Sequence, residues 1–135
     1  MGNFLGYLLK CNNNTDNSWL LASSYKSKPN QREEIRAIRD ENTRNLTRVT
    51  AEGTKTVIEF QTLPVDLVGK EKIQKFFNDA MTDKLQRKVT VTYWNDEDND
   101  YITSNFYLPD IEFNIDYIDE ANIYYSPLTF KLIEY

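Results

Sequence analysis

Residues 67–81 read LVGKEKIQKFFNDAM and carry the only clear helical period in the chain. Apolar side chains recur there at intervals of three and four, so they share one face of a helix, and charged or amide side chains take the other. Asp66 or Gly69 is the expected N-cap. The apolar face consists of Ile73, Phe76, Phe77, Ala80 and Met81. A helix of this kind buries its apolar face against another element, so we expect it to lie on a sheet.

Alternating apolar and polar residues predict β-strands on both sides of this helix. The predicted strands cover residues 4–11, 19–25, 45–50, 54–63, 87–94, 101–108, 111–117 and 123–135, the last with a break at Pro127. Antiparallel strands with one helix predict a mainly β (α+β) fold, an antiparallel β-sandwich or rolled sheet with the amphipathic helix on its flank. The predicted structural core consists of Ile58, Phe60, Ile73, Phe76, Phe77, Val89, Val91, Phe106, Phe113 and Phe130.

Length and composition indicate one folded domain spanning residues 1–135. A chain of 135 residues has the usual size of a single domain and can bury a core without disulfides. Hydrophobic residues make up 40% of it and aromatic residues 13%, which argues against a disordered chain. The many Tyr and Phe residues favour sheets, because flat rings pack well on a pleated surface.

The net charge and the missing residue types disfavour several classes of protein. A net charge of -5 disfavours a basic groove for specific nucleic-acid binding, and it suits either a soluble surface or a wall that does not hold DNA by its phosphates. The absence of histidine removes the commonest general base and transition-metal ligand. Cys11 is the only cysteine, so an intrachain disulfide or a Cys-rich zinc site is impossible. No run approaches the length of a membrane span, so a membrane partner is not expected.

The chain before the helix contains a predicted hairpin and an ambiguous segment. Strands at 45–50 and 54–63 are joined by residues 51–53, which predicts a three-residue turn with Gly53 at positive φ. Residues 26–44 are sparse in apolar side chains and balanced in charge. They predict either a long solvated loop or an arm that becomes ordered against a neighbouring subunit.

No group of residues forms a recognisable catalytic site. Asp96, Asp98 and Asp100 have the spacing of the first three ligands of a calcium loop, but Tyr101 stands where that loop requires Gly and no Glu closes it. A charged hairpin tip is therefore the favoured interpretation. Cys11 has no histidine to activate it as a nucleophile. We expect no catalytic residue, no metal and no cofactor, and hence no enzyme.

Residues 32–48 carry interleaved arginines and carboxylates, which predict either a loop held by its own salt bridges or a surface that pairs subunits through Arg–carboxylate contacts. Trp94 shares its strand face with polar residues, so it is a candidate for either the core or an interface. The candidate subunit-interface residues are Arg32, Ile35, Arg36, Ile38, Arg39, Arg44 and Trp94.

Several short segments after residue 24 form a recognisable series. They are Tyr25-Lys26 followed by Pro29, then RNLTR at 44–48, KTVIEF at 55–60, VTVTYW at 89–94, NFY at 105–107 and LTFKLIE at 128–134. Together they resemble small virion proteins encoded in tail modules of phages and prophages of Gram-positive bacteria. The resemblance implies a tail-tube-like structural protein of the tail or baseplate, located in the virion and assembled in the host cytoplasm. It further implies partners that are copies of the chain in a hexameric ring and other tail proteins, with no catalytic residues. Residues 1–19 have no counterpart in this resemblance.

A soluble monomeric β-sandwich that binds a peptide or sugar on an open sheet face is the alternative from a different class. The solution mass, with and without tail partners, distinguishes the two.

Overall fold

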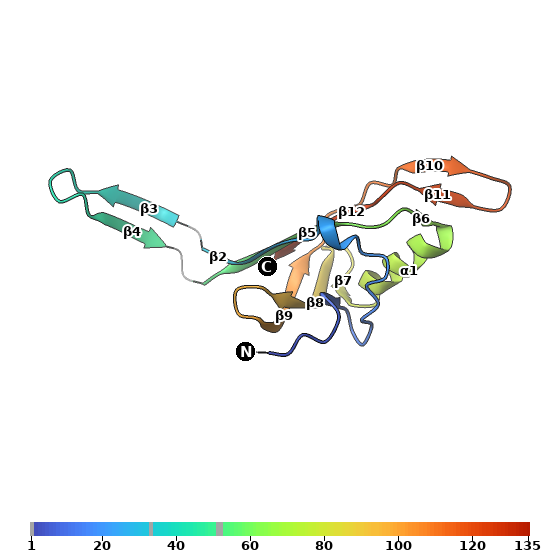
Figure 1. Ribbon diagram of the computed structural model, residues 1–135, viewed down its shortest axis with the longest axis horizontal. Coiled ribbons are helices and arrows are strands. Elements are labelled where there is room, and N and C mark those ends of the chain that lie inside the picture. The colour runs from blue at the N-terminus through green and yellow to red at the C-terminus, as the bar shows by residue number, and fades with distance from the viewer. Residues whose placement is uncertain (1, 33, 51–52) are drawn as a thin grey trace.

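The computed structural model describes residues 2–32, 34–50 and 53–135, apart from the side chains of residues 34–37, 47, 49 and 50. The described chain is mainly β with one α-helix, and every strand pairing within it is antiparallel. Two β-hairpins extend from opposite ends of a central sheet that carries the helix (Figure 1). The predicted fold class is confirmed.

The central sheet forms the body of the molecule. Its longest ladder pairs β8 with β9 from Lys88–Tyr107 at one end to Asn95–Asp100 at the other. β7 (Met81–Asp83) also pairs with β8. The strand order across the sheet is β1 (Leu9–Lys10), β8 (Lys88–Asn95), β9 (Asp100–Tyr107), β12 (Thr129–Glu134), β5 (Lys55–Gln61) and β2 (Lys26–Gln31).

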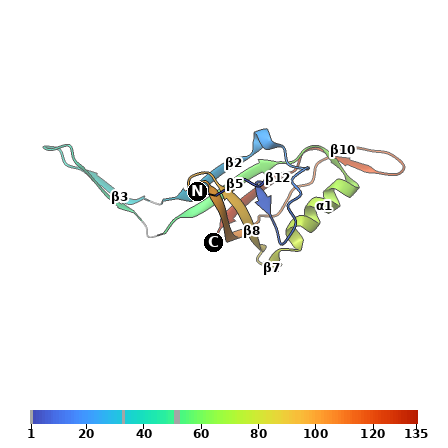
Figure 2. The same ribbon diagram turned by 60° about the horizontal axis from the view of Figure 1, so that its bottom comes forward.

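The helix α1 (Leu67–Asn78) lies along one flank of this sheet, as Figure 2 shows. Its N-cap is Asp66, whose carboxylate accepts a hydrogen bond from the Gly69 N–H at 2.8 Å. The helix ends three residues earlier than the period predicts, because Met81 begins β7 and pairs with β8. The local pattern thus fixes the start and the buried face, and the sheet fixes the end.

The core lies between α1 and the inner face of the sheet. Phe60, Phe77 and Phe130 stack there with ring centroids 5.2–6.4 Å apart. Phe113 is wrongly predicted as core: its side chain is 40% exposed and lies outside the buried cluster. The other predicted core residues are all buried, namely Ile58, Phe60, Ile73, Phe76, Phe77, Val89, Val91, Phe106 and Phe130.

Residues 26–61 fold differently from the prediction. β3 (Glu34–Arg39) pairs with β4 (Leu46–Thr50), and β2 pairs with β5, so the described parts of this segment follow one long hairpin. The long-loop prediction for 26–44 is therefore wrong. The hairpin predicted to turn at 51–53 is wrong as well, since the chain turns at 40–45. Gly53 does have positive φ, at 79°, while residues 51–52 lie outside the described residues.

The turn at 40–45 is built by a side chain that the prediction overlooked. The Asp40 carboxylate accepts hydrogen bonds from the N–H groups of Asn42 and Thr43, each at 2.8 Å, and Arg44 takes positive φ at 60°. These hydrogen bonds hold the pKa of Asp40 below its usual range. An aspartate that bonds its own backbone in this way is a strong turn former.

The N-terminal region contains less strand than predicted. Within residues 4–11 only Leu9–Lys10 pairs as a strand, and the Asn17 side chain accepts the N–H groups of Leu8 and Leu9 at 2.8 and 3.1 Å. Residues 19–25 contain the short 3-10 helix η1 (Ala22–Ser24) instead of a strand.

A second hairpin projects from the end of the molecule that holds the start of α1. It consists of β10 (Ile115–Ile118) and β11 (Ile123–Tyr125), and β11 also pairs with β6 (Val65–Asp66). The Asn122 side chain joins its turn to the helix, accepting the Leu67 N–H at 3.3 Å and donating to Asp66 at 3.3 Å. Figure 1 shows this hairpin at the opposite end from β3 and β4.

Candidate interaction surfaces

The hairpin of β3 and β4, residues 34–50, is named the arm here. Within the described residues its two strands pair only with each other, so both outer edges are open to another chain. Ile38 and Leu46 are exposed by 46% and 49%. Ile38 pairs with Thr47 and Leu46 pairs with Arg39, which places the two apolar side chains on opposite faces of the arm. The arm therefore offers apolar contacts on both faces.

The predicted interface residues of the arm fall into two groups. Arg39 donates a hydrogen bond to the Arg44 carbonyl oxygen at 2.8 Å and so braces the turn, and the Arg44 side chain is exposed beside it. The side chains of Ile35 and Arg36 lie outside the described residues. The structure thus brings Ile38, Arg39 and Arg44 together at one end of the molecule.

A network of polar side chains sets the direction in which the arm leaves the sheet. The ladder between β2 and β5 shifts register between Lys28 and Gln31, and Asn30 takes positive φ at 51°. The buried Asn95 amide donates to the Asn30 side chain at 3.2 Å, and its oxygen accepts the N–H groups of Glu97 and Asp98. The turn between β8 and β9 is therefore joined to the root of the arm.

Arg32 belongs to this root rather than to the arm's free end. It forms an ion pair with Glu97, and the hydrogen bond from Arg32 lowers the pKa of the Glu97 carboxyl. Within the chain Arg32 thus forms a salt bridge, as one of the two interpretations predicts, but its partner lies in the turn between β8 and β9 and not in residues 32–48. The acidic run between Asp96 and Asp100 forms the turn itself, as the hairpin-tip interpretation predicts.

Residues 109–126, which include β10 and β11, are named the acidic hairpin here. They contain five Asp or Glu residues and no Lys or Arg. Ile115 and Ile118 are exposed by 58% and 68%, and Phe113 and Tyr117 are exposed as well. Contiguous exposed apolar side chains of this kind are uncommon on a monomeric protein and mark interaction sites.

Aromatic rings organise the acidic hairpin. Lys70 of α1 places its Nζ 4.9 Å from the ring centroid of Tyr125 and 5.2 Å from that of Phe113. Tyr117 and Tyr124 stack across the two strands with centroids 4.3 Å apart. This pair lines an open cavity of about 450 Å³ together with Asp66, Asp116, Pro64 and Tyr125.

Trp94 lies on the outer face of the sheet under the chain's own N-terminal segment. Its ring meets Phe4 at 5.5 Å and Tyr101 at 5.1 Å, both edge to face. The Tyr101 hydroxyl accepts the Leu5 N–H and donates to the Tyr7 carbonyl, each at 2.9 Å. Trp94 is partly covered by these contacts, so it anchors the N-terminal segment in this chain.

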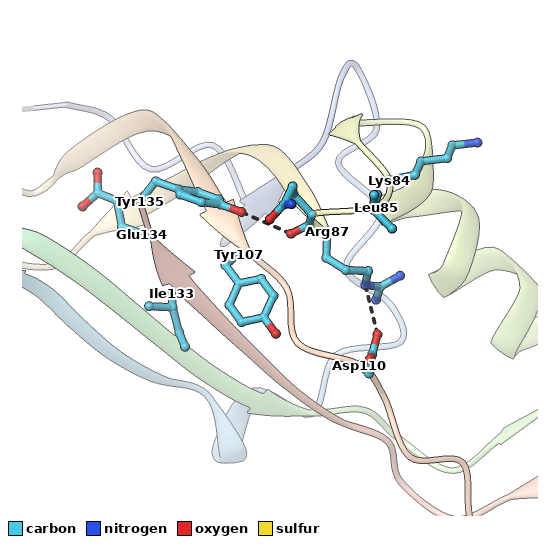
Figure 3. A pocket seen from close by; sticks show the side chains of 9 residues that line it. Lys84, Leu85, Arg87, Tyr107, Asp110, Ile133, Glu134 and Tyr135 are labelled. Atoms are coloured by element: carbon cyan, nitrogen blue, oxygen red, sulfur yellow. Dashed lines mark hydrogen bonds and ion pairs between the residues drawn. The ribbon is translucent and has the colours of Figure 1, made fainter.

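An open cavity of about 640 Å³ lies beside the last residues of the sheet (Figure 3). Arg87 is engaged there, donating to the Leu108 carbonyl at 3.1 Å and lying 3.7 Å from Asp110. The Tyr135 hydroxyl donates to the Gln86 carbonyl at 3.1 Å. The Glu134 carboxylate accepts hydrogen bonds from the Thr56 N–H at 2.8 Å and from the Ser104 hydroxyl, so it links strands β5 and β9 of the sheet. These polar groups are held by structural partners and present no nucleophile beside a base.

Two further observations concern metal binding and the chemistry of the single thiol. Among the side chains that the structure describes, no three of His, Cys, Asp or Glu come close enough to hold a metal ion. Cys11 is buried, and burial raises the pKa of its thiol to about 12, so the reactive thiolate is scarce at neutral pH.

The exposed apolar side chains of the acidic hairpin are not among the residues predicted to form an interface. Residues 109–126 combine apolar alternation with five carboxylates and no basic residue. Alternation shows that one strand face is apolar, and for this reason it predicts Phe113 in the core. It does not show that another element covers that face.

None of the helices in the described parts of the chain is long and apolar enough to cross a membrane. A family model described as "Family of unknown function (DUF6711)" matches residues 1–135. No curated protein and no solved structure matches the chain significantly.

Proposed function

This chain belongs to the DUF6711 family, whose function is unknown, and we propose that it is a non-enzymatic structural subunit of a phage tail or baseplate assembly. The observation that carries the proposal is the pair of hairpins that extend from opposite ends of one sheet (Figure 1). Both expose apolar side chains, at Ile38 and Leu46 in the arm and at Ile115 and Ile118 in the acidic hairpin. Exposed apolar patches mark interaction sites, so these two hairpins are suited to joining subunits.

The tail assignment rests on the resemblance of the strand sequences to tail-module proteins of phages and prophages of Gram-positive bacteria. The partners in this proposal are copies of the chain in a ring, a hexamer in the resemblance, and other tail proteins. The net charge of -5 fits an assembly through which DNA passes without being held by phosphate contacts. The location is the tail of the virion.

Electron microscopy of particles tests the assignment directly. Phage particles from a host that encodes this chain are labelled with gold-conjugated antibody against the chain, and particles from a host lacking it serve as the control. We expect label at the tail or baseplate. Complete particles that carry no label, with the chain left in the soluble fraction as a monomer, would overturn the proposal and favour the monomeric binding module.

A further inference from the structure

The two projecting hairpins carry opposite charge. The arm, residues 34–50, contains four Arg and three Asp or Glu, a net charge of +1, and its root in β2 adds Lys26 and Lys28. Residues 109–126 have a net charge of -5. Because the arm and the acidic hairpin lie at opposite ends of the molecule (Figure 1), they cannot neutralise each other within one chain. They complement each other between copies.

The acidic hairpin already shows that its rings bind a cation. One side of its aromatic cluster, Tyr125 with Phe113, holds the ammonium group of Lys70. The stacked rings of Tyr117 and Tyr124 line the open cavity beside Asp116, and in the described part of the chain no lysine or arginine lies over them. Tyrosine faces next to carboxylates favour a guanidinium group, which stacks on rings and pairs with carboxylates.

The arm has the shape and the side chains to fill such a site. It is a two-stranded ribbon with open edges, and the outer edge of β10 is open too. A strand added to that edge gains backbone hydrogen bonds in addition to side-chain contacts. At its turn the arm presents the exposed Arg44 next to the exposed Leu46. An arginine and an apolar side chain therefore arrive together at one end.

We propose that the acidic hairpin receives the arm of a second copy, with Arg44 of that copy against Tyr117 and Asp116 and its apolar side chains against Ile115 and Ile118. The contact is heterologous, since each copy offers its arm to one neighbour and its acidic hairpin to another. Contacts of this type generate a ring when the rotation closes. The inference rests on the proposed function only in that copies of the chain assemble.

Two variants test this contact. Each is altered in only one of the two hairpins and is called half-blocked. The arm variant carries Ile38→Asp and Arg44→Glu, and the hairpin variant carries Asp116→Arg and Tyr117→Ala. All four side chains are exposed and lie outside the core, and circular dichroism checks that each variant keeps the fold, including Tyr117→Ala, which removes the ring stacked on Tyr124. Glu71→Arg, on the exposed face of α1, is the matched control because it changes the net charge by the same amount as Asp116→Arg.

Sedimentation velocity on the full chain measures the outcome. We expect the wild type and Glu71→Arg to form species larger than a dimer, and each half-blocked variant to lose at least about tenfold in self-association affinity. An equal mixture of the two variants should give a one-to-one dimer and nothing larger, because one intact arm meets one intact acidic hairpin.

Three results would overturn the inference. They are a wild type that stays monomeric up to about 1 mM, a half-blocked variant that assembles like the wild type, and a mixture that forms no dimer. An interface in which the same hairpin of two copies pairs would give the second result, because each half-blocked variant keeps one hairpin intact. The gold-labelling experiment reports separately on the tail assignment, so labelled particles without this contact keep that assignment and remove only the inference.

Discussion

At the scale of single residues, Phe77 joins the helix to the sheet. Its ring, 1% exposed, stacks on Phe130 at 5.3 Å and meets Trp19 at 6.0 Å. We expect Phe77→Ala to lower the free energy of unfolding by about 3–5 kcal/mol, because the cavity would be lined by rigid rings. Phe113→Ala, at an exposed ring, is the control and should cost less than about 1 kcal/mol. Denaturant unfolding measures both, and similar small losses would mean that the helix does not pack as described.

Asp66 makes the start of the helix sensitive to acid. The hydrogen bond from the Gly69 N–H holds the pKa of Asp66 below its ordinary value of 3.8. The folded state thus favours the carboxylate, so this stabilisation is present above pH 3.8 and is lost as the pH falls through the lowered pKa. Asp66→Asn keeps an acceptor but does not titrate. We therefore expect the melting temperature of the wild type to fall more steeply on acidification than that of Asp66→Asn. Parallel plots of melting temperature against pH would contradict the assignment.

At the scale of elements, local signals predicted α1 and long-range pairing decided the arm. The helical period and the Asp66 cap are properties of adjacent residues, and both are confirmed. The partner of β4 depends on β5, which is held between β2 and β12 and so cannot pair with β4. The sequence at 51–53 gives no indication that β2 and β12 take the place of β4 beside β5. The arginine candidates for the interface likewise rest on the charge pattern of the sequence, whereas the ion pair of Arg32 with Glu97 depends on the distant turn between β8 and β9.

Asn95 joins that turn to the root of the arm. Its buried amide contacts Asn30 and the N–H groups of Glu97 and Asp98. We expect Asn95→Ala to lower the free energy of unfolding by about 1–3 kcal/mol, because the lost partners leave polar groups unpaired. Asn105 bonds Thr90 on the exposed face of the same sheet at 2.7 Å, so Asn105→Ala should stay within about 0.5 kcal/mol. Equal effects in urea unfolding would show that burial of the amide is unimportant.

The arm is the element least supported by the rest of the fold. A two-stranded hairpin without a covering layer is marginally stable in water. We expect the ladder amides of Ile38 and Asp40, of which Asp40 donates to the Asn45 carbonyl oxygen at 2.8 Å, to exchange quickly in the isolated subunit and slowly in the assembly. Hydrogen exchange with mass spectrometry measures this, and the ladder between β8 and β9 supplies the internal standard that is protected in both states. An arm already protected in the free subunit would mean that assembly does not stabilise it.

At the scale of the whole molecule, the opposite charges of the two ends predict how assembly responds to salt. Charges near a surface interact over a Debye length of about 10 Å at 0.1 M salt and about 3 Å at 1 M. The contact between the arm and the acidic hairpin should therefore weaken as sodium chloride is added, with a rising dissociation constant in sedimentation equilibrium. The core of packed aromatic rings carries no such dependence, so unfolding in the same salt series is the control. Association that strengthens with salt would show instead that Ile115, Ile118 and the arm's apolar side chains drive assembly, with the charges serving only to set its direction.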